Sequence, residues 1–518
     1  MFLDKFPWWN ETQKKLADEV EAFADQYYPD AEEAAWKRQT PWKVLNAVKE
    51  KGWFGALIPK KYGGLREELA ITGACIVNEE ISRLGVVGTI YGGSMFGGAH
   101  QIETFGTEEQ RERWLPAMAS GEKIGAICIT EPPVGSDAAA VATEARLEGD
   151  EYIITGKKRF TTGLGIADIY MFYARTSEDP KDRQANRHLT AFIIEKGMKG
   201  FTVEKVNELC GGDGLLNGYL NLDEVRVPVS NRLAGEGDGW TIMMSGLNVE
   251  RTIASSQILG QMREAIRFAH FHSQRRVQFG QPTMLAQTNQ FKIADMIMQL
   301  KTCRLLVYYA AHLLDIGGGG PYGPVIEATV AKLLTSESYV SLTSNAIQVM
   351  GGDGWTKFYP VEAMYRAAKV TEIAAGTSEV MRMILYRLGT RLMAHELEPP
   401  RRVIHPELGV PVDRFDEVPE SEKLKITQDN VLKVLAEDYR VNPGLYMSRQ
   451  DLMRYLTGTE EELDEVLMEL EEKKLVVLSR GRRGTIKLAN ATYQGLKKAN
   501  PLEYYQYYPE WVNRKEIF

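Results

Sequence analysis

The sequence predicts a mainly α-helical protein with a central antiparallel β domain and a small α+β domain near its C-terminal end. Three observations predict this fold class. Helical periodicity runs to about residue 124, short β-branched runs broken by turns continue to about residue 235, and helical periodicity then returns to about residue 397. The chain has 518 residues, of which 44% are hydrophobic and 25% charged, which is enough for several domains of ordinary globular composition.

The predicted domains follow these changes of pattern in chain order. Residues 1–124 form an N-terminal helical domain, in which Leu16, Val20 and Phe23 share one helix face. Residues 125–235 form the β domain, because the helical patterns that separate the strands of a βαβ sheet are missing. Residues 236–397 form a helical bundle, with a loop between two long helices at the glycine run 317–320.

A separate module follows a proline-rich linker at residues 398–425. Residues 426–500 show three short helices and a β-hairpin, the outline of a winged helix, and Thr459 with Glu462 forms a capping-box pattern. A basic wing at Arg480, Arg482, Arg483 and Lys487 leaves DNA binding as one alternative. The acidic residues between 460 and 472 would repel DNA, which favours docking to a partner protein instead. The aromatic tail at residues 501–518 also suits docking onto another surface.

Charge and cysteine content exclude several classes of protein. The formal net charge of −8 gives no overall attraction to nucleic acid or to an anionic membrane. No stretch has the apolar length of a membrane span, and the first residues lack the apolar core of a signal peptide. The four cysteines lack C-x-x-C spacing, so we expect reduced thiols, a cytoplasmic protein and no metal site.

Two candidate ligand-binding segments lie in the predicted β domain. The first ends a strand and reads Ile127-Cys-Ile-Thr-Glu-Pro-Pro-Val-Gly-Ser-Asp137, where hydroxyls and exposed N–H groups suit a polar ring edge or an anion. The second, Phe160-Thr-Thr-Gly163, places an aromatic ring and a hydroxyl on one face of a strand, which suits a flat cofactor. The first pattern would also fit an ordinary turn, and the second would also fit a pair of side chains that pack across neighbouring strands.

Three further segments lie in the helical bundle. Arg276-Val-Gln-Phe-Gly280, followed by Gln287, offers a cation to a diphosphate, although an Arg at a helix end also suits the helix dipole. Gln348-Val-Met-Gly-Gly-Asp-Gly354 and Ala374-Ala-Gly-Thr-Ser-Glu379 contain glycines that allow a ligand close to the backbone. Thr377 fits an ordinary helix N-cap equally well.

Taken together and in this order, the five segments resemble the acyl-CoA dehydrogenase family over roughly residues 8–394. The resemblance implies FAD as cofactor, an acyl-CoA substrate, an electron-transfer flavoprotein as electron acceptor, and a homotetramer or at least a homodimer. It implies that the flavin lies against Ile127, Cys128, Ile129, Thr130, Ser136, Phe160, Thr161 and Thr162. It also implies contacts with the FAD of a neighbouring subunit from Arg276, Phe279, Gln287, Gln348, Gly351 and Gly352, and a final FAD-contacting segment of Thr377, Ser378 and Glu379.

One residue departs from the family pattern. Many members carry the catalytic Glu where this chain has Ala375, and an Ala cannot remove a proton. On the helix after Gly239, Glu250 falls within an apolar stripe, where a carboxylate is costly unless it has a purpose. Its segment resembles the one that supplies the base in the isovaleryl-CoA and long-chain branch of the family. We therefore predict Glu250 as the base, with Glu372 as a rival and a buried ion pair as the structural alternative.

The predicted reaction is the FAD-dependent dehydrogenation of an acyl-CoA thioester to the trans-2-enoyl-CoA. Glu250 would take the α-proton, the Ala375 N–H would bind the thioester oxygen, and a hydride would pass to flavin N5. We expect Ser136, Asn248, Arg251 and Gly376 to contact the substrate. A flavin monooxygenase or oxidase on the same fold is the alternative.

Two stretches bear on the choice of substrate. Tyr91-Gly-Gly-Ser-Met-Phe-Gly-Gly-Ala99 lies where the family walls its acyl pocket, and its glycines leave room for a branched, cyclic, aromatic or long acyl group. Close packing of helices through small residues would explain the same glycines. Gly214-Leu-Leu-Asn217 replaces the family's usual Ser-Asp-Thr, which argues against a standard thioester contact there.

Overall fold

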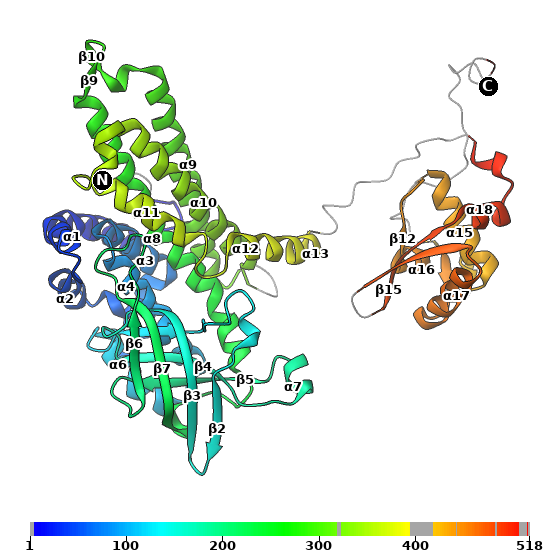
Figure 1. Ribbon diagram of the computed structural model, residues 1–518, viewed down its shortest axis with the longest axis horizontal. Coiled ribbons are helices and arrows are strands. Elements are labelled where there is room, and N and C mark those ends of the chain that lie inside the picture. The colour runs from blue at the N-terminus through cyan, green and yellow to red at the C-terminus, as the bar shows by residue number, and fades with distance from the viewer. Residues whose placement is uncertain are drawn as a thin grey trace. The chain divides into compact units, whose positions relative to one another are not determined.

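The computed structural model describes residues 5–318, 323–393, 418–441, 443–481, 484–506 and 515. The chain forms two compact units, residues 1–392 and 393–518. The first unit has helices before and after one large sheet (Figure 1), which confirms the predicted fold class. Most of the predicted linker, two arginines of the predicted wing and most of the aromatic tail lie outside the described residues.

The N-terminal part of the first unit is helical. Leu16, Val20 and Phe23 are buried on one face of its first helix, as their spacing predicts. Capping boxes at Asn10 and Thr107 satisfy the free N–H groups at the starts of two helices. The helices are α1 (Glu11–Trp36), α2 (Trp42–Glu50), α3 (Arg66–Ile81), α4 (Val87–Ser94), a π-helical turn (Met95–Ala99), α5 (His100–Phe105) and α6 (Glu108–Ala119).

The middle of this unit is an eight-stranded sheet with the order β6-β7-β3-β2-β4-β5-β8, and β1 pairs with β4. β1 runs parallel to β4, and one residue pair joins β2 to β4 in parallel, so the prediction of a purely antiparallel domain is wrong in this detail. The chain returns from β1 to its neighbour only after the β2–β3 hairpin, which lets the two strands run in one direction. The strands are β1 (Gly125–Cys128), β2 (Glu144–Glu148), β3 (Glu151–Thr162), β4 (Ile169–Arg175), β5 (Leu189–Glu195), β6 (Phe201–Val206), β7 (Asn217–Pro228) and β8 (Arg232–Leu233), with α7 (Pro180–Gln184) between β4 and β5.

The last part of the first unit is a helical bundle built on one long helix, α8 (Gly239–Arg275). A small hairpin, β9 (Val277–Gln278) and β10 (Gln281–Pro282), lies at the end of α8 far from the sheet (Figure 1). α9 (Gln287–Asp315) and α10 (Val325–Met350) pack against α8 and against each other. α11 (Val361–Thr371), α12 (Ser378–Ile384), a π-helical turn (Leu385–Gly389) and α13 (Thr390–Leu392) complete the bundle.

The long helix is fixed against α3 by close packing and by buried charges. A Cβ on Gly260 would lie 1.9 Å from the carbonyl oxygen of Glu79, so only a glycine allows this approach of the two helices. The buried Arg83 guanidinium donates to Glu80 at 3.0 Å and to Glu264 at 2.7 Å. Buried charges that lose such partners are strongly destabilising, so this cluster holds α3 and α8 in one register.

The second unit has its own apolar core, which includes Leu432, Leu463 and Leu467. Thr459 and Glu462 form the predicted capping box at the start of α17. The unit contains α15 (Gln428–Val441), α16 (Arg449–Tyr455), α17 (Glu460–Glu472) and α18 (Tyr493–Ala499), the pair β11 (Leu424–Lys425) and β13 (Leu456–Thr457), and a sheet of β12 (Met447–Ser448), β15 (Ile486–Ala491) and β14 (Val476–Arg480). In the described parts of the chain, every helix is too short or too polar to cross a membrane.

Candidate active site

The two predicted flavin segments of the β domain lie side by side in the sheet region. The N–H of Arg159 donates to the carbonyl of Thr130 at 2.7 Å, and the Thr161 hydroxyl contacts the Cys128 sulfur at 3.6 Å. Cys128 and Thr161 are buried, whereas Ile127, Ile129 and Thr130 are partly exposed and Ser136 is exposed in the loop that follows. The structure therefore brings residues 127–130 and 160–162 together.

A buried ion pair anchors both segments. The Lys158 ammonium donates to Glu131 at 2.7 Å, to the carbonyl of Tyr173 at 2.7 Å and to that of Ile129 at 3.2 Å. The side chains of Lys158 and Glu131 are 0% and 2% exposed. Burial alone would raise the pKa of Glu131, but Lys158 holds that pKa below its usual value. The pair thus links the loop after β1 to β3 and β4.

Phe160 occupies an irregular position in β3. The pairing of β3 with β7 shifts between Lys158 and Thr161, which marks a β-bulge, and Phe160 has a φ of 58°. Its ring is 50% exposed, and Thr162 is also more exposed than Thr161 between them. The Asn217 amide donates to the Phe160 carbonyl at 2.8 Å and to the Thr162 hydroxyl at 3.1 Å. Asn217, which departs from the family pattern, therefore supports the aromatic–hydroxyl pair.

Glu250 lies on α8 and is partly buried. Burial raises the pKa of its carboxyl group to about 7, against an opposing effect of Arg251. Burial raises the pKa of the Tyr173 hydroxyl on β4, and the charge of Glu250 raises it further, so the two side chains are near each other. Within the part of the chain that the structure describes, Glu250 has no ion pair or hydrogen bond, which argues against the buried ion pair considered as an alternative.

The loop with Ala375 lies next to the same turn of α8. The Arg251 guanidinium, which is buried, donates to the carbonyl of Ala375 at 3.4 Å. Ala375 and Gly376 have φ values of 55° and 97°, and Thr377 caps α12 by accepting from the N–H of Val380. The turn of α8 that carries Glu250 and the loop at Ala375 are thus adjacent, although they lie far apart in sequence.

The rival carboxylate is engaged elsewhere. Glu372 forms an ion pair with Lys369, one turn earlier at the end of α11. Asn248, a predicted substrate contact, is partly buried on α8, while Ser378 is buried and Glu379 exposed in the first turn of α12.

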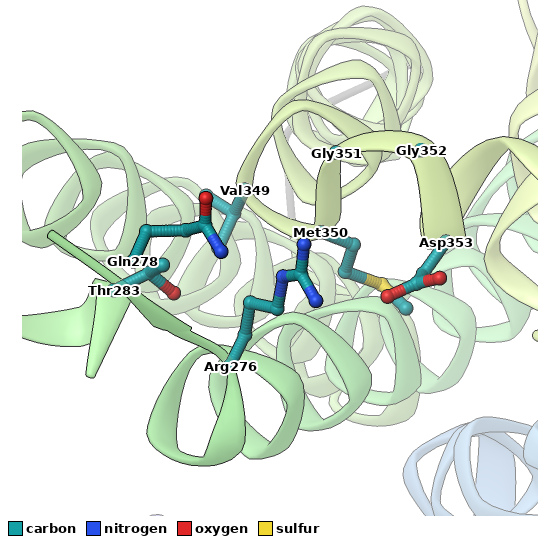
Figure 2. A pocket seen from close by; sticks show the side chains of 8 residues that line it. All are labelled: Arg276, Gln278, Thr283, Val349, Met350, Gly351, Gly352 and Asp353. Carbon is teal, nitrogen blue, oxygen red and sulfur yellow. The ribbon is translucent and has the colours of Figure 1, made fainter. Parts of the chain in front are cut away.

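A second candidate site lies at the far end of α8. Arg276 and the turn at Gly351 and Gly352 line one pocket of about 280 Å³, together with Gln278, Thr283, Val349, Met350 and Asp353. Figure 2 shows the Arg276 guanidinium reaching toward Met350. A Cβ on Gly351 or Gly352 would meet no atom within 4 Å, so the backbone here is open to a ligand. Two predicted cofactor segments thus share one pocket.

The remaining predicted residues of this group lie outside that pocket. Phe279 is 103% exposed at the tip of the β9–β10 hairpin and has a φ of 51°. Gln287 begins α9 and is exposed, and Gln348 is an exposed residue of α10. All three side chains are therefore exposed in the single chain.

Family descriptions cover most of the first unit. Residues 10–122 match "Acyl-CoA dehydrogenase, N-terminal domain", residues 126–225 match the middle domain and residues 237–389 match the C-terminal domain. The chain belongs to the acyl-CoA dehydrogenase family. It is 37% identical to an acyl-CoA dehydrogenase of Bacillus subtilis over 364 residues, which make up 70% of this chain and 93% of the relative.

Solved structures of similar fold support the same assignment. Butyryl-CoA dehydrogenase from Megasphaera elsdenii matches with a TM-score of 0.70 and 32% identity, over 75% of this chain and 100% of that one. A chain of a structure described as an electron transferring flavoprotein of Acidaminococcus fermentans matches with a TM-score of 0.70 and 34% identity, over the same shares. The family descriptions stop at residue 389, before the second unit begins.

Sequence reasoning missed several residues that shape the site of this acyl-CoA dehydrogenase family member. Lys158 and Lys332 are buried side chains that donate to carbonyls distant in sequence, and the buried Tyr173 supplies one of those carbonyls to Lys158. A lysine inside a strand that alternates with apolar residues is a signal that could have found Lys158. The other two have no pattern in the sequence that separates them from core residues of a strand or a helix.

Proposed function

We propose that this chain catalyses the FAD-dependent α,β-dehydrogenation of an acyl-CoA thioester to the trans-2-enoyl-CoA, with Glu250 as the base that removes the α-proton. The observation that carries the proposal is the position of Glu250, partly buried on α8 beside the Ala375 loop and without a pairing partner among the described residues. A carboxyl group with a pKa of about 7 is largely deprotonated just above neutral pH, so it can act as a general base there.

FAD fits the residues that are present. The pocket at Arg276 and Gly351 offers a guanidinium and open backbone, which suit a diphosphate. The half-exposed ring of Phe160 beside the Thr162 hydroxyl offers a stacking face and a hydrogen-bonding group to a flat ring. When bound, the flavin supplies the acceptor for the β-hydride, which no side chain can provide.

The loop at Ala375 suits the thioester oxygen. Within the described residues, the N–H groups of Ala375 and Gly376 have no hydrogen-bond acceptor, so they are available to a ligand. Donors placed where negative charge develops stabilise the enolate-like transition state and so acidify the α-proton. We propose that Ser136, Asn248 and Arg251 contribute the remaining contacts to the substrate.

We propose that the enzyme is a homotetramer, with a homodimer as the minimum. At about 1.5 Å per residue, roughly 39 Å of α8 lies between Glu250 and Arg276, which is longer than an extended FAD molecule. The pocket at Arg276 would therefore hold the FAD of a second copy. The strongly exposed rings of Phe279, Trp355 and Phe358 on the bundle fit burial against that copy.

We propose an electron-transfer flavoprotein as electron acceptor, because a similar solved chain is described with such a protein. We also propose a cytoplasmic location, since Cys75, Cys128, Cys210 and Cys303 are all free thiols, as a reducing compartment would keep them.

For the second unit we propose docking to a partner protein rather than to nucleic acid, on a winged-helix-like scaffold. Most exposed positions of α17, the helix that would enter a DNA groove, are acidic, and Met468 is the apolar exception. The acidic ones are Glu460, Glu461, Glu462, Glu465, Glu469 and Glu472. Arg480 of the wing is already paired with Glu471. A surface of this charge repels phosphate and suits a basic protein surface.

Anaerobic mixing with a panel of acyl-CoAs, followed by flavin absorbance, tests the proposed reaction. Glu250→Gln should still bind FAD, but the rate at which substrate bleaches the flavin should fall by about 10²- to 10⁴-fold, because the α-proton has no acceptor. Adding Ala375→Glu to that variant should restore part of the rate, since the two positions are adjacent. The matched control, Glu372→Gln, should bleach like the wild type. Wild-type bleaching rates in Glu250→Gln would refute the assignment.

A further inference from the structure

The loop at residues 374–377 has a conformation that needs support. Ala375 and Gly376 follow each other at φ values of 55° and 97°, and a residue with a side chain is strained in this region. Two cations hold the loop from two different helices. The Nε of Arg251 on α8 donates to the carbonyl of Ala375 at 3.4 Å, and the Nζ of Lys332 on α10 donates to the carbonyl of Gly376 at 2.6 Å.

Lys332 is an unusual residue to find in this place. It is 3% exposed, and burial together with the nearby charge of Arg251 lowers its pKa to about 8. The carboxylates whose charges reach Lys332 are those of Glu372, Glu337 and Glu379. Glu372 pairs with Lys369, and Glu337 pairs with Arg382. Lys332 therefore directs its ammonium group at a backbone carbonyl, although burying an ammonium group without a paired carboxylate is costly.

The two carbonyl contacts determine where the loop's N–H groups point. In a trans peptide the C=O and the N–H point in opposite directions. Holding the Ala375 carbonyl on Arg251 turns the Gly376 N–H, which belongs to the same peptide, away from that guanidinium. Holding the Gly376 carbonyl on Lys332 orients the next peptide, whose N–H belongs to Thr377, and so limits rotation about the backbone bonds of Gly376. The N–H groups of Ala375 and Gly376 have no acceptor among the described residues. Successive free N–H groups in a left-handed turn form a site for an oxygen that carries negative charge.

We propose that Lys332 is a positioning residue for the reaction. Its ammonium group fixes the Gly376–Thr377 peptide while Arg251 fixes the Ala375–Gly376 peptide, and this double anchorage keeps the N–H groups of Ala375 and Gly376 aimed at the thioester oxygen while that oxygen gains negative charge. This inference rests on the proposed dehydrogenation and adds to it a residue that does not contact the substrate. Arg251 supports the same loop from the turn that carries the base.

The two titrating groups give the inference a pH signature. Glu250, faced by Arg251 and Tyr173, must lose its proton to act as a base, so the rate rises with pH through about 7. Lys332, faced by Arg251, Glu337, Glu372 and Glu379, must keep its proton to hold the carbonyl most strongly, so the rate falls as pH rises through about 8. The structure therefore predicts a narrow bell-shaped profile with its maximum between these two values.

The experiment compares the FAD-loaded enzyme with Lys332→Met, which keeps the volume but has no donor, and Lys332→Gln, which keeps an N–H donor without charge. The control is Lys369→Met, which removes an exposed lysine from the same region without touching a loop carbonyl. The readouts are FAD content, bleaching rate with the best acyl-CoA of the panel, and the charge-transfer band of bound acetoacetyl-CoA as a function of pH. That band reports how strongly the site stabilises the enolate.

Lys332→Met should retain FAD, and its bleaching rate should be lower by on the order of 10²-fold. Its rate should no longer fall at alkaline pH, and the apparent pKa of bound acetoacetyl-CoA should be higher than in the wild type. Lys332→Gln should fall between Lys332→Met and the wild type, and Lys369→Met should match the wild type. If Lys332→Met retains the wild-type rate and the wild-type acetoacetyl-CoA pKa, the inference is wrong while the dehydrogenation stands. If none of the acyl-CoAs in the panel bleaches the flavin of the wild-type enzyme, the proposed function itself fails.

Discussion

Replacing Lys158 by Met should destabilise the protein far more than replacing its neighbour Lys157. Lys158→Met removes three hydrogen bonds and leaves Glu131 buried without its cation. Breaking a buried ion pair costs about 3–5 kcal/mol. Glu131 keeps two backbone donors, the N–H groups of Ala142 and Thr143, so we expect a loss near the lower limit, about 3 kcal/mol.

Urea unfolding followed by flavin fluorescence and circular dichroism measures this loss. Lys157 pairs with Glu204 at 2.8 Å, but the two side chains are 49% and 42% exposed, so Lys157→Met should cost less than about 1 kcal/mol. The double variant Lys158→Met/Glu131→Gln should be more stable than Lys158→Met alone, because no unpaired carboxylate remains. Because Lys158 lowers the pKa of Glu131, this stabilisation is present above the usual Glu pKa and is lost as the pH falls through the folded-state value. Equal costs at positions 157 and 158 would refute the reasoning.

Three further predictions concern the glycine-rich stretch and the second unit. A Cβ on Gly97 would lie 2.5 Å from the backbone nitrogen of Ala126. Gly97→Ala should therefore reduce the free energy of unfolding by about 1–3 kcal/mol through overpacking, lower the melting temperature and weaken FAD retention. Gly93 has no atom within 4 Å of such a Cβ, so Gly93→Leu should keep the melting temperature while shifting activity in the acyl-CoA panel toward shorter chains. The full-length protein should not bind duplex DNA in a fluorescence anisotropy titration at low salt; tight binding that weakens steeply with added salt would contradict the proposed docking role.

The sequence predicted features that depend on local patterns or on neighbouring residues. The capping box at Thr459 and the N-cap at Thr377 follow from short segments whose chemistry suffices to define them. The order of helices, strands and helices follows from periodicity in the same way. Glu250 could be singled out because a carboxylate on an apolar helix face conflicts with burial unless it is used.

Other features depend on partners that are distant in the sequence. The bulge that turns Phe160 outward is set by the register of β3 against β7 and by the Asn217 amide. The parallel pairing of β1 with β4 depends on where the chain re-enters the sheet. Lys332 lies among the buried positions of α10, and only the folded chain shows that it meets the Gly376 carbonyl. Local patterns carry no information on such contacts.

The unbroken course of α8 has a consequence for how this chain can vary. One helix carries Glu250 near its beginning and leads directly into Arg276 at its end. An α-helix advances by about 100° for each residue, so a single inserted residue between these positions would leave the base in place and swing the hairpin to another side of the bundle. The number of residues between 250 and 276 is therefore constrained as strictly as the two residues themselves. We expect natural insertions and deletions in the loops on either side of the helix instead.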